Sequence, residues 1–251
     1  MSTDIGDQRS RAKYARLTGG MYLVYILTMV LADVFGHIGP SSVSELAAAM
    51  AAGDLSFRIG LVFTLVSALL FALVAWGLHA LLRPVNKDLA LLFLLLNAIG
   101  VAIHCLSMLP LISTMLQSGA AGQMQVFTTA QLSALGLLSA GTYKVVFVTA
   151  QLFFGAWLFP LGYLVYKSGI LPKFLGVLLL ADGIGVLIWF LQALVFPEYV
   201  AVRTPGLIVS FIAEFGLAVW LLFKGVRADG PTAKSKVRMR PATSSAPASV
   251  S

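Results

Sequence analysis

The feature that most constrains this chain is a set of six apolar runs, each long enough to cross a lipid bilayer. A bilayer core about 30 Å thick is crossed by roughly 20 helical residues. The six runs take up most of the sequence, and they occupy residues 17–35, 57–82, 89–111, 145–166, 174–196 and 205–223. The sequence therefore predicts an all-α, polytopic transmembrane helical bundle with about six spans.

Composition agrees with this class, since 59% of the residues are hydrophobic and 11% are charged, against about a quarter charged in soluble domains. We predict a basic cytoplasmic N-terminal segment over residues 1–16 and a six-helix transmembrane domain over residues 17–224. Residues 225–251 are rich in Pro, Ser, Ala and basic residues, which predicts a disordered basic cytoplasmic tail. The longest loops, 41–54 and 118–141, have room for short interfacial helices only.

The distribution of Lys and Arg indicates how the bundle lies in the membrane. With both termini in the cytoplasm, 14 of the 17 Lys and Arg face the cytoplasm, and Arg58, Lys144 and Arg203 face the other side. Cytoplasmic loops of membrane proteins carry such an excess. We therefore expect a multi-pass protein of the cell's inner membrane with both termini cytoplasmic. The net charge of +7 then reflects topology, and we expect the lipid bilayer, not nucleic acid, as a partner.

Six polar side chains inside the predicted spans are the candidate functional residues. An ionised side chain at the bilayer centre costs about 2.5–3.5 kcal/mol, so we expect such groups to face the bundle interior. Helical spacing supports this, because Asn97 and His104 share one stripe of the third span, and Ser210 lies one turn before Glu214 on the sixth. The six candidates are Asp182, Glu214, His104, Asn97, Asp33 and Gln151.

Two interpretations of this polar set are open. In the first, Glu214, Asp182 and His104 handle protons or a substrate, because a carboxyl group taken out of water holds its proton more tightly and histidine changes charge near neutral pH. In the second, His104 pairs with Asp33, and the other two acids are protonated and hydrogen-bond to neighbouring helices. We favour the second interpretation for Asp33 and the first for Asp182 and Glu214.

The sequence lacks the motifs of several familiar enzyme classes. Its three histidines lie at different depths, and its single cysteine, Cys105, excludes disulfides within the chain and thiolate metal clusters. It contains no HExxH, GxSxG, Walker A, GxGxxG or CxxC pattern. We therefore expect no metal and no cofactor, and we assign no catalytic residue. A buried carboxylic acid could still protonate or isomerise a lipid or terpenoid substrate.

Two stretches within the spans are similar to each other. The sequence "LLNAIGVAI" at residues 95–103 aligns with "LADGIGVLI" at residues 180–188, which places Asn97 on Asp182. The aligned stretches belong to the second-to-third and fourth-to-fifth hairpins, and both hairpins run the same way through the membrane. The similarity is a candidate parallel repeat of these two hairpins.

Three further stretches carry a family resemblance. They are "ARLTGGMYLVY" at the first span, "LLRPVNKDLALL" between the second and third, and "GYLVYKSGILPKFLGVLLLADGIG" between the fourth and fifth. Together they resemble the bacterial membrane proteins grouped as domain of unknown function 4386, over about residues 15–225. The resemblance implies a six-helix integral membrane protein, and it implies no activity, cofactor or site residue.

Three functions are open at this point. The leading hypothesis is a protein that binds or moves a small solute or protons through the interior polar set. The first alternative is a membrane-embedded enzyme that acts on a lipid or terpenoid by acid catalysis, with Asp182 or Glu214 as the proton donor. The second is a non-enzymatic scaffold or regulatory subunit. A cavity that reaches Asp182 or Glu214 separates the first two from the third, and the sequence leaves the oligomeric state undetermined.

Overall fold

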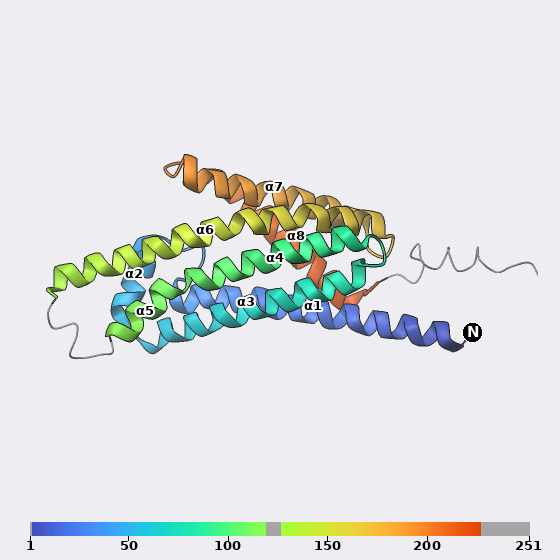
Figure 1. Cartoon of the computed structure of the whole chain (residues 1–251), viewed down its shortest axis with the longest axis horizontal. Helices are drawn as coiled ribbons and strands as arrows, with labels where there is room; N and C mark the ends of the chain where they lie inside the picture. Colours follow the sequence, from blue (N-terminus) through green and yellow to red (C-terminus); the bar gives the residue numbers. More distant parts are fainter. Residues whose placement is uncertain (1, 119–126, 227–251) are drawn as a thin grey trace, which may run out of the picture.

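The computed structural model describes residues 2–118 and 127–226, and these residues form helices without any strand (Figure 1). The elements are α1 (Ser2–Gly36), α2 (Val43–Ala52), α3 (Leu55–Leu82), α4 (Lys87–Ser107), α5 (Leu109–Ser118), α6 (Thr129–Ser168), α7 (Lys173–Val195), the short 3-10 helix η2 (Val200–Arg203) and α8 (Thr204–Phe223). Six helical segments of this part of the chain are long and apolar enough to cross a membrane. The predicted all-α bundle with six spans is therefore confirmed.

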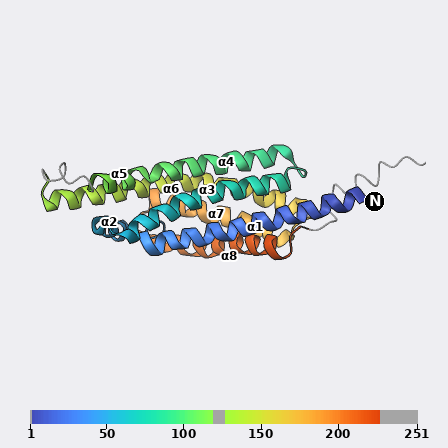
Figure 2. The same cartoon turned by 90° about the horizontal axis from the view of Figure 1, so that it is seen from below.

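The six spans form a closed ring in chain order. α1 packs on α3, α3 on α4, the α4 span on α6, α6 on α7, and α7 on α8, and α8 closes the ring by packing on α1. Figure 2 shows this closure, with α8 lying along α1. Contact across the ring, between α3 and α6, is slight by comparison. Each span therefore turns one side toward a common centre.

The two ends of the bundle differ. α2 and α5 lie at one end, which we call the α2 end, and α1 begins at the opposite end, which we call the terminal end (Figure 1). The 40 residues of α6 make a helix about 60 Å long, twice the thickness of a bilayer core of about 30 Å. Its first turns therefore extend past the membrane at the α2 end.

The fourth span begins earlier than the sequence predicted. We predicted a loop over residues 118–141 with room for a short interfacial helix, whereas from Thr129 onward the chain already belongs to the helix of the fourth span, α6. A capping box fixes this start, because the Thr128 hydroxyl accepts a hydrogen bond from the backbone N–H of Gln131 and the Gln131 side chain accepts one from the backbone N–H of Thr128. The prediction was wrong because the polar residues of these first turns conceal the helix from a search for apolar runs.

The other long loop holds a short helix, which the sequence left room for. α2 begins with a capping box of the same kind, in which the Glu45 carboxylate accepts hydrogen bonds from the backbone N–H and the hydroxyl of Ser42, both at 2.7 Å. It ends at Gly53, whose φ of 57° suits a glycine C-cap. The helix therefore turns the chain back from α1 into α3.

The predicted N-terminal segment is continuous with the first span, which begins at Ser10. Residues 2–16, predicted as a separate basic segment, continue α1 as helix. The predicted disordered tail, residues 225–251, falls outside the described residues from position 227 onward. The domain boundaries and the cytoplasmic placement of these segments stay predictions.

Paired glycines bring α7 into backbone contact with both of its neighbours. A Cβ atom at Gly162 of α6 would lie 2.9 Å from the carbonyl oxygen of Gly176 in α7. A Cβ atom at Gly206 of α8 would likewise lie 2.9 Å from the carbonyl oxygen of Gly185 in α7. Small residues at such contacts let membrane helices approach closely, and van der Waals packing then stabilises the pair. These contacts position the helix that carries Asp182.

The outer surface of the ring is apolar and its interior contains the polar side chains. Leu69, Ile184 and Phe211 are each more than half exposed on the outside, as expected of residues that face lipid. Asn97 and Asp182, by contrast, have no accessible surface. This inversion of a soluble protein's polarity, together with six long apolar helices, identifies a multi-pass membrane protein.

Candidate functional site

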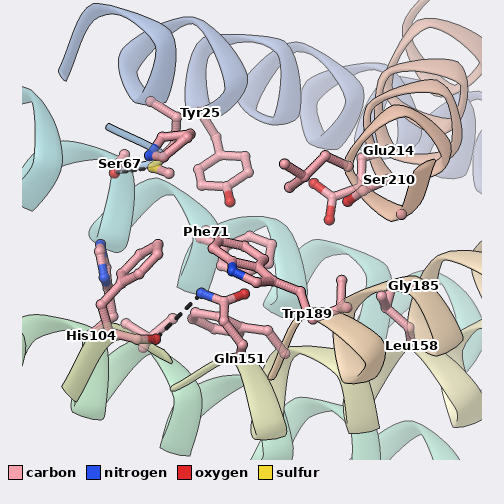
Figure 3. A pocket seen from close by; sticks show the side chains of 18 of the residues that line it. Tyr25, Ser67, Phe71, His104, Gln151, Leu158, Gly185, Trp189, Ser210 and Glu214 are labelled. Carbon is pink, nitrogen blue, oxygen red and sulfur yellow. Dashed lines mark hydrogen bonds between the residues drawn. The ribbon is translucent and has the colours of Figure 1, made fainter. Parts of the chain in front are cut away.

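A cavity of about 200 Å³ lies inside the ring, and all six spans contribute to its wall (Figure 3). Its polar side chains are Tyr25, Ser67, His104, Gln151, Ser210 and Glu214. Aromatic rings form much of the remaining wall, namely Phe71, Phe147, Phe154 and Trp189. An apolar cavity of about 150 Å³ is large enough to bind benzene. The cavity can therefore accept a small organic molecule.

Glu214 places a carboxyl group in the wall of this cavity. It projects from α8 one turn after Ser210, and both side chains point toward the central space in Figure 3. Protein atoms surround the Glu214 side chain, and the surface that it keeps accessible borders the cavity. The buried Tyr22 hydroxyl of α1 interacts electrostatically with this carboxyl group, without a hydrogen bond of regular geometry. Glu214 is therefore the acid that a molecule in the cavity would meet.

Asp182 lies next to Glu214 but outside the cavity wall. It interacts electrostatically with Glu214 and with the Ser210 hydroxyl, and it has no accessible surface. Neither of its oxygens has a hydrogen bond of regular geometry with any residue in the described part of the chain. Across the same residues, no Lys or Arg acts on either acid. Two neighbouring carboxylates without a cation are costly inside a membrane protein, so the pair needs at least one proton or a bound cation.

His104 and Gln151 form the opposite side of the cavity. The His104 ring is 5% exposed, and neither of its nitrogens has a hydrogen-bond partner among residues 2–118 and 127–226. Its edge meets the ring of Phe147 at a centroid distance of 5.4 Å. The Gln151 side chain donates a hydrogen bond to the Phe147 carbonyl at 3.4 Å, drawn as the dashed line from the Gln151 nitrogen in Figure 3. His104 therefore offers the cavity a polar group that protein atoms leave unsatisfied.

The structure brings three of the six predicted site residues, Glu214, His104 and Gln151, into the cavity wall. Asp182 is not in the wall, but it lies one helical turn before Gly185 and Val186, which are, and it interacts electrostatically with Glu214. Asn97 is fully buried on α4 away from the cavity, and within the described ranges neither atom of its amide has a partner. Asn97 and Asp182 thus share burial and the lack of a regular hydrogen bond to any described residue, but the parallel repeat that aligns them stays a prediction.

Asp33 lies apart from the other candidates, toward the α2 end. Its carboxylate accepts a hydrogen bond from the Ser41 hydroxyl at 2.7 Å. The pairing of Asp33 with His104 that we considered is therefore not formed, because the loop after α1 folds back and supplies Ser41 as the partner. The bond joins the loop after α1 to the end of that helix.

Sequence reasoning missed the aromatic part of the cavity wall. Tyr25 stacks on Phe71 with ring centroids 4.4 Å apart, and Phe147 meets Trp189 edge-on at 5.8 Å. Aromatic residues within a span can face either lipid or the bundle interior, so their presence alone does not show which way they face. The only available signal was helical phase, since Phe71 lies one turn after Ser67.

The combination of a carboxyl pair and aromatic rings suits an organic cation. Aromatic faces attract ammonium groups, with a gain of about 0.5–2 kcal/mol, and a carboxylate supplies the opposite charge. In residues 2–118 and 127–226, no three His, Cys, Asp or Glu side chains gather to hold a metal ion. The arrangement can therefore bind protons or a small organic cation.

Comparison with known proteins identifies the relatives of this chain. The family described as "Domain of unknown function (DUF4386)" matches residues 17–225. An uncharacterized protein of Archaeoglobus fulgidus is 34% identical over 152 residues, which make up 61% of this chain and 75% of that protein. No solved structure matches the chain.

Proposed function

The chain belongs to the family described as Domain of unknown function (DUF4386), and we propose that it binds a small apolar molecule with one positive charge, such as a protonated amine, in exchange for protons. A single observation carries this proposal, the central cavity with Glu214 in its wall and with Asp182 interacting with that carboxyl group. A scaffold has no need of such a cavity. The same acids could donate a proton in catalysis, but no Lys or Arg of residues 2–118 and 127–226 acts on them, which favours binding of a cation.

Electrostatics explains why protons and an amine would compete for this site. With no ligand bound, a proton on Glu214 or Asp182 lowers the cost of burying two like charges. A bound ammonium group can take over this role, because its charge lies against the Glu214 carboxylate. Binding of the amine then releases a proton. Since the two ligands compete, the apparent affinity for the amine rises with pH, by up to about tenfold per unit for each proton displaced.

The walls of the cavity favour an apolar cation over a hydrated inorganic one. The rings of Tyr25, Phe71 and Trp189 line the space around Glu214 and can contact both the apolar body and the charge of an organic ammonium ion. Small-molecule sites commonly combine such apolar walls with a few polar groups that fix orientation. We therefore expect a small ring or branched chain that carries one amine.

Binding of benzylammonium tests this proposal directly. We expect calorimetry on the protein in lipid nanodiscs to show benzylammonium binding at least about tenfold more tightly than benzyl alcohol, its neutral counterpart. Titrations in buffers of different ionisation enthalpy should show release of about one proton per bound amine. Equal affinity for the two compounds without proton release would contradict the proposal.

We also infer that the terminal end faces the cytoplasm and that the protein lies in the cell's inner membrane, because most Lys and Arg fall on the loops and tails of that end. Labelling with a membrane-impermeant maleimide tests the orientation in a Cys105→Ala background. The Ser44→Cys variant, at the α2 end, should react in intact cells. The Arg83→Cys variant should react only after the membrane is disrupted, and the reverse pattern would show the opposite orientation.

A further inference from the structure

A second hollow, of about 470 Å³, opens at the α2 end between α2, α6, α7 and η2. It shares Pro40, Phe147 and Trp189 with the central cavity, and the edge-on contact of the Phe147 and Trp189 rings lies where the two spaces meet. Two cationic side chains line it, Lys144 of α6 and Arg203 of η2. This hollow plays no part in the exchange proposed for Glu214.

The charges of Lys144 and Arg203 are not neutralised by ion pairs with any described residue. The Lys144 ammonium donates a hydrogen bond to the carbonyl of Gly39, and the Arg203 guanidinium donates one to the carbonyl of Pro40 at 3.4 Å. The guanidinium carbon also lies 5.9 Å from the centroid of the Trp189 ring. The two cations repel each other. An anion between them would relieve this repulsion and gain charge-assisted hydrogen bonds.

Two acidic side chains, Asp33 and Glu45, act on Lys144, and Glu45 also lines the hollow. Both carboxylates already accept hydrogen bonds from other groups. The Asp33 carboxylate accepts from Ser41, and the Glu45 carboxylate accepts from the hydroxyl and the backbone N–H of Ser42. These bonds from Ser42 hold the pKa of Glu45 below its usual range. Glu45 therefore stays ionised, with its oxygens directed to the start of α2, and leaves the cations available to a ligand.

The rim of the hollow is apolar on the side that faces lipid. Val145 is 59% exposed, Leu194 53% and Val200 50%, and all three also line the hollow. A molecule that fits therefore has an anionic head for Lys144 and Arg203 and an apolar chain for this rim. The N-terminus of α8, which follows Arg203 directly, adds a partial positive charge beside the head.

We propose that this hollow binds the phosphate group of an anionic membrane lipid, with Lys144 and Arg203 as the contacts and with the acyl chain against Val145 and Leu194. Arg203 can present two N–H groups to a pair of phosphate oxygens, and Lys144 adds a point charge. The same two cations would also bind free phosphate, but free phosphate has no apolar group to contact the rim. The site is independent of the proposed exchange at Glu214.

Lipid binding measured by native mass spectrometry tests this site. The full-length protein is released from detergent with phosphatidylglycerol or phosphatidylcholine added at known concentrations. Two cations near the membrane surface give roughly a thirtyfold preference for the anionic lipid. We expect the wild type to show such a preference and the Lys144→Gln/Arg203→Gln double variant to lose it.

Matched variants separate the site from general effects of charge and folding. Arg58→Gln removes an exposed cation from the same end of the bundle outside the hollow, and it should leave the preference unchanged. Lys144→Arg keeps the charge and should retain the preference. An equal affinity of the wild type for both lipids, or an unchanged preference in the double variant, would overturn the site. If millimolar inorganic phosphate displaced phosphatidylglycerol, the ligand would be free phosphate and the proposed lipid site would be wrong, although Lys144 and Arg203 would still be the contacts.

Discussion

Replacement of Glu214 by Gln is expected to weaken benzylammonium binding at least about 100-fold and to abolish the accompanying proton release. The substitution keeps the size of the side chain and removes the charge that meets the ammonium group in the cavity. Loss of one partner of a buried charge pair costs about 3–5 kcal/mol, and about 2.7 kcal/mol already corresponds to 100-fold. Calorimetry in nanodiscs measures both the affinity and the number of protons released.

Glu198 provides a matched control for this substitution. It is an acid exposed at the α2 end, and Glu198→Gln removes the same charge without touching the cavity. We expect this variant to bind benzylammonium as the wild type does. If Glu214→Gln also bound it with wild-type affinity, the carboxyl group would not be the anchor and the proposed exchange would be wrong.

Replacement of Gly162 by Ala is expected to lower the free energy of unfolding by about 1–3 kcal/mol, the usual cost of an overpacked contact. The added Cβ would lie 2.9 Å from the Gly176 carbonyl oxygen and 3.1 Å from the backbone nitrogen of Leu180. Neither backbone atom can move without separating α6 from α7. Chemical or thermal unfolding of the purified protein in detergent measures the change.

Gly141 supplies a control on the same helix. A Cβ atom there meets nothing within 4 Å, so Gly141→Ala should gain up to about 1 kcal/mol through the higher helix propensity of alanine. The two identical substitutions are therefore expected to change stability in opposite directions. A gain of stability in both variants would show that α6 and α7 are not in backbone contact at Gly162.

Much of the fold follows from the sequence because the membrane imposes it. A span must satisfy its own backbone hydrogen bonds and present about 20 apolar residues, and both conditions are local. The six runs therefore locate all six spans. The closure of the ring by α8 on α1 is not local, since it depends on which faces of distant helices fit together, as at Gly206 and Gly185.

The start of α6 shows where local reasoning from hydropathy fails. Its first turns, from Thr129, lie beyond the apolar run that marks the fourth span. The signal for this start was a Thr128–Gln131 capping box, which a search for apolar runs does not detect. Attention to helix caps would have corrected the boundary.

The candidate site was predictable in its residue types and only partly in its geometry. The cost of a charge in the bilayer marked Glu214 and Asp182 as interior residues, and the structure places them side by side. Helical phase could not show that Asn97 lies away from the cavity, because phase gives direction relative to one helix and not to its neighbours. Asp33 bonds to Ser41 of a loop whose path the sequence does not define.

The most direct test of the exchange between an amine and protons is the infrared absorption of the carboxyl groups before and after addition of benzylammonium. We predict that binding removes a protonated carboxyl band from the wild-type spectrum. The change should be absent in Glu214→Gln, and Asp182→Asn should alter the frequency of the band because the two acids interact. If benzylammonium bound to the wild-type protein and no carboxyl band changed, the proposed exchange would be contradicted.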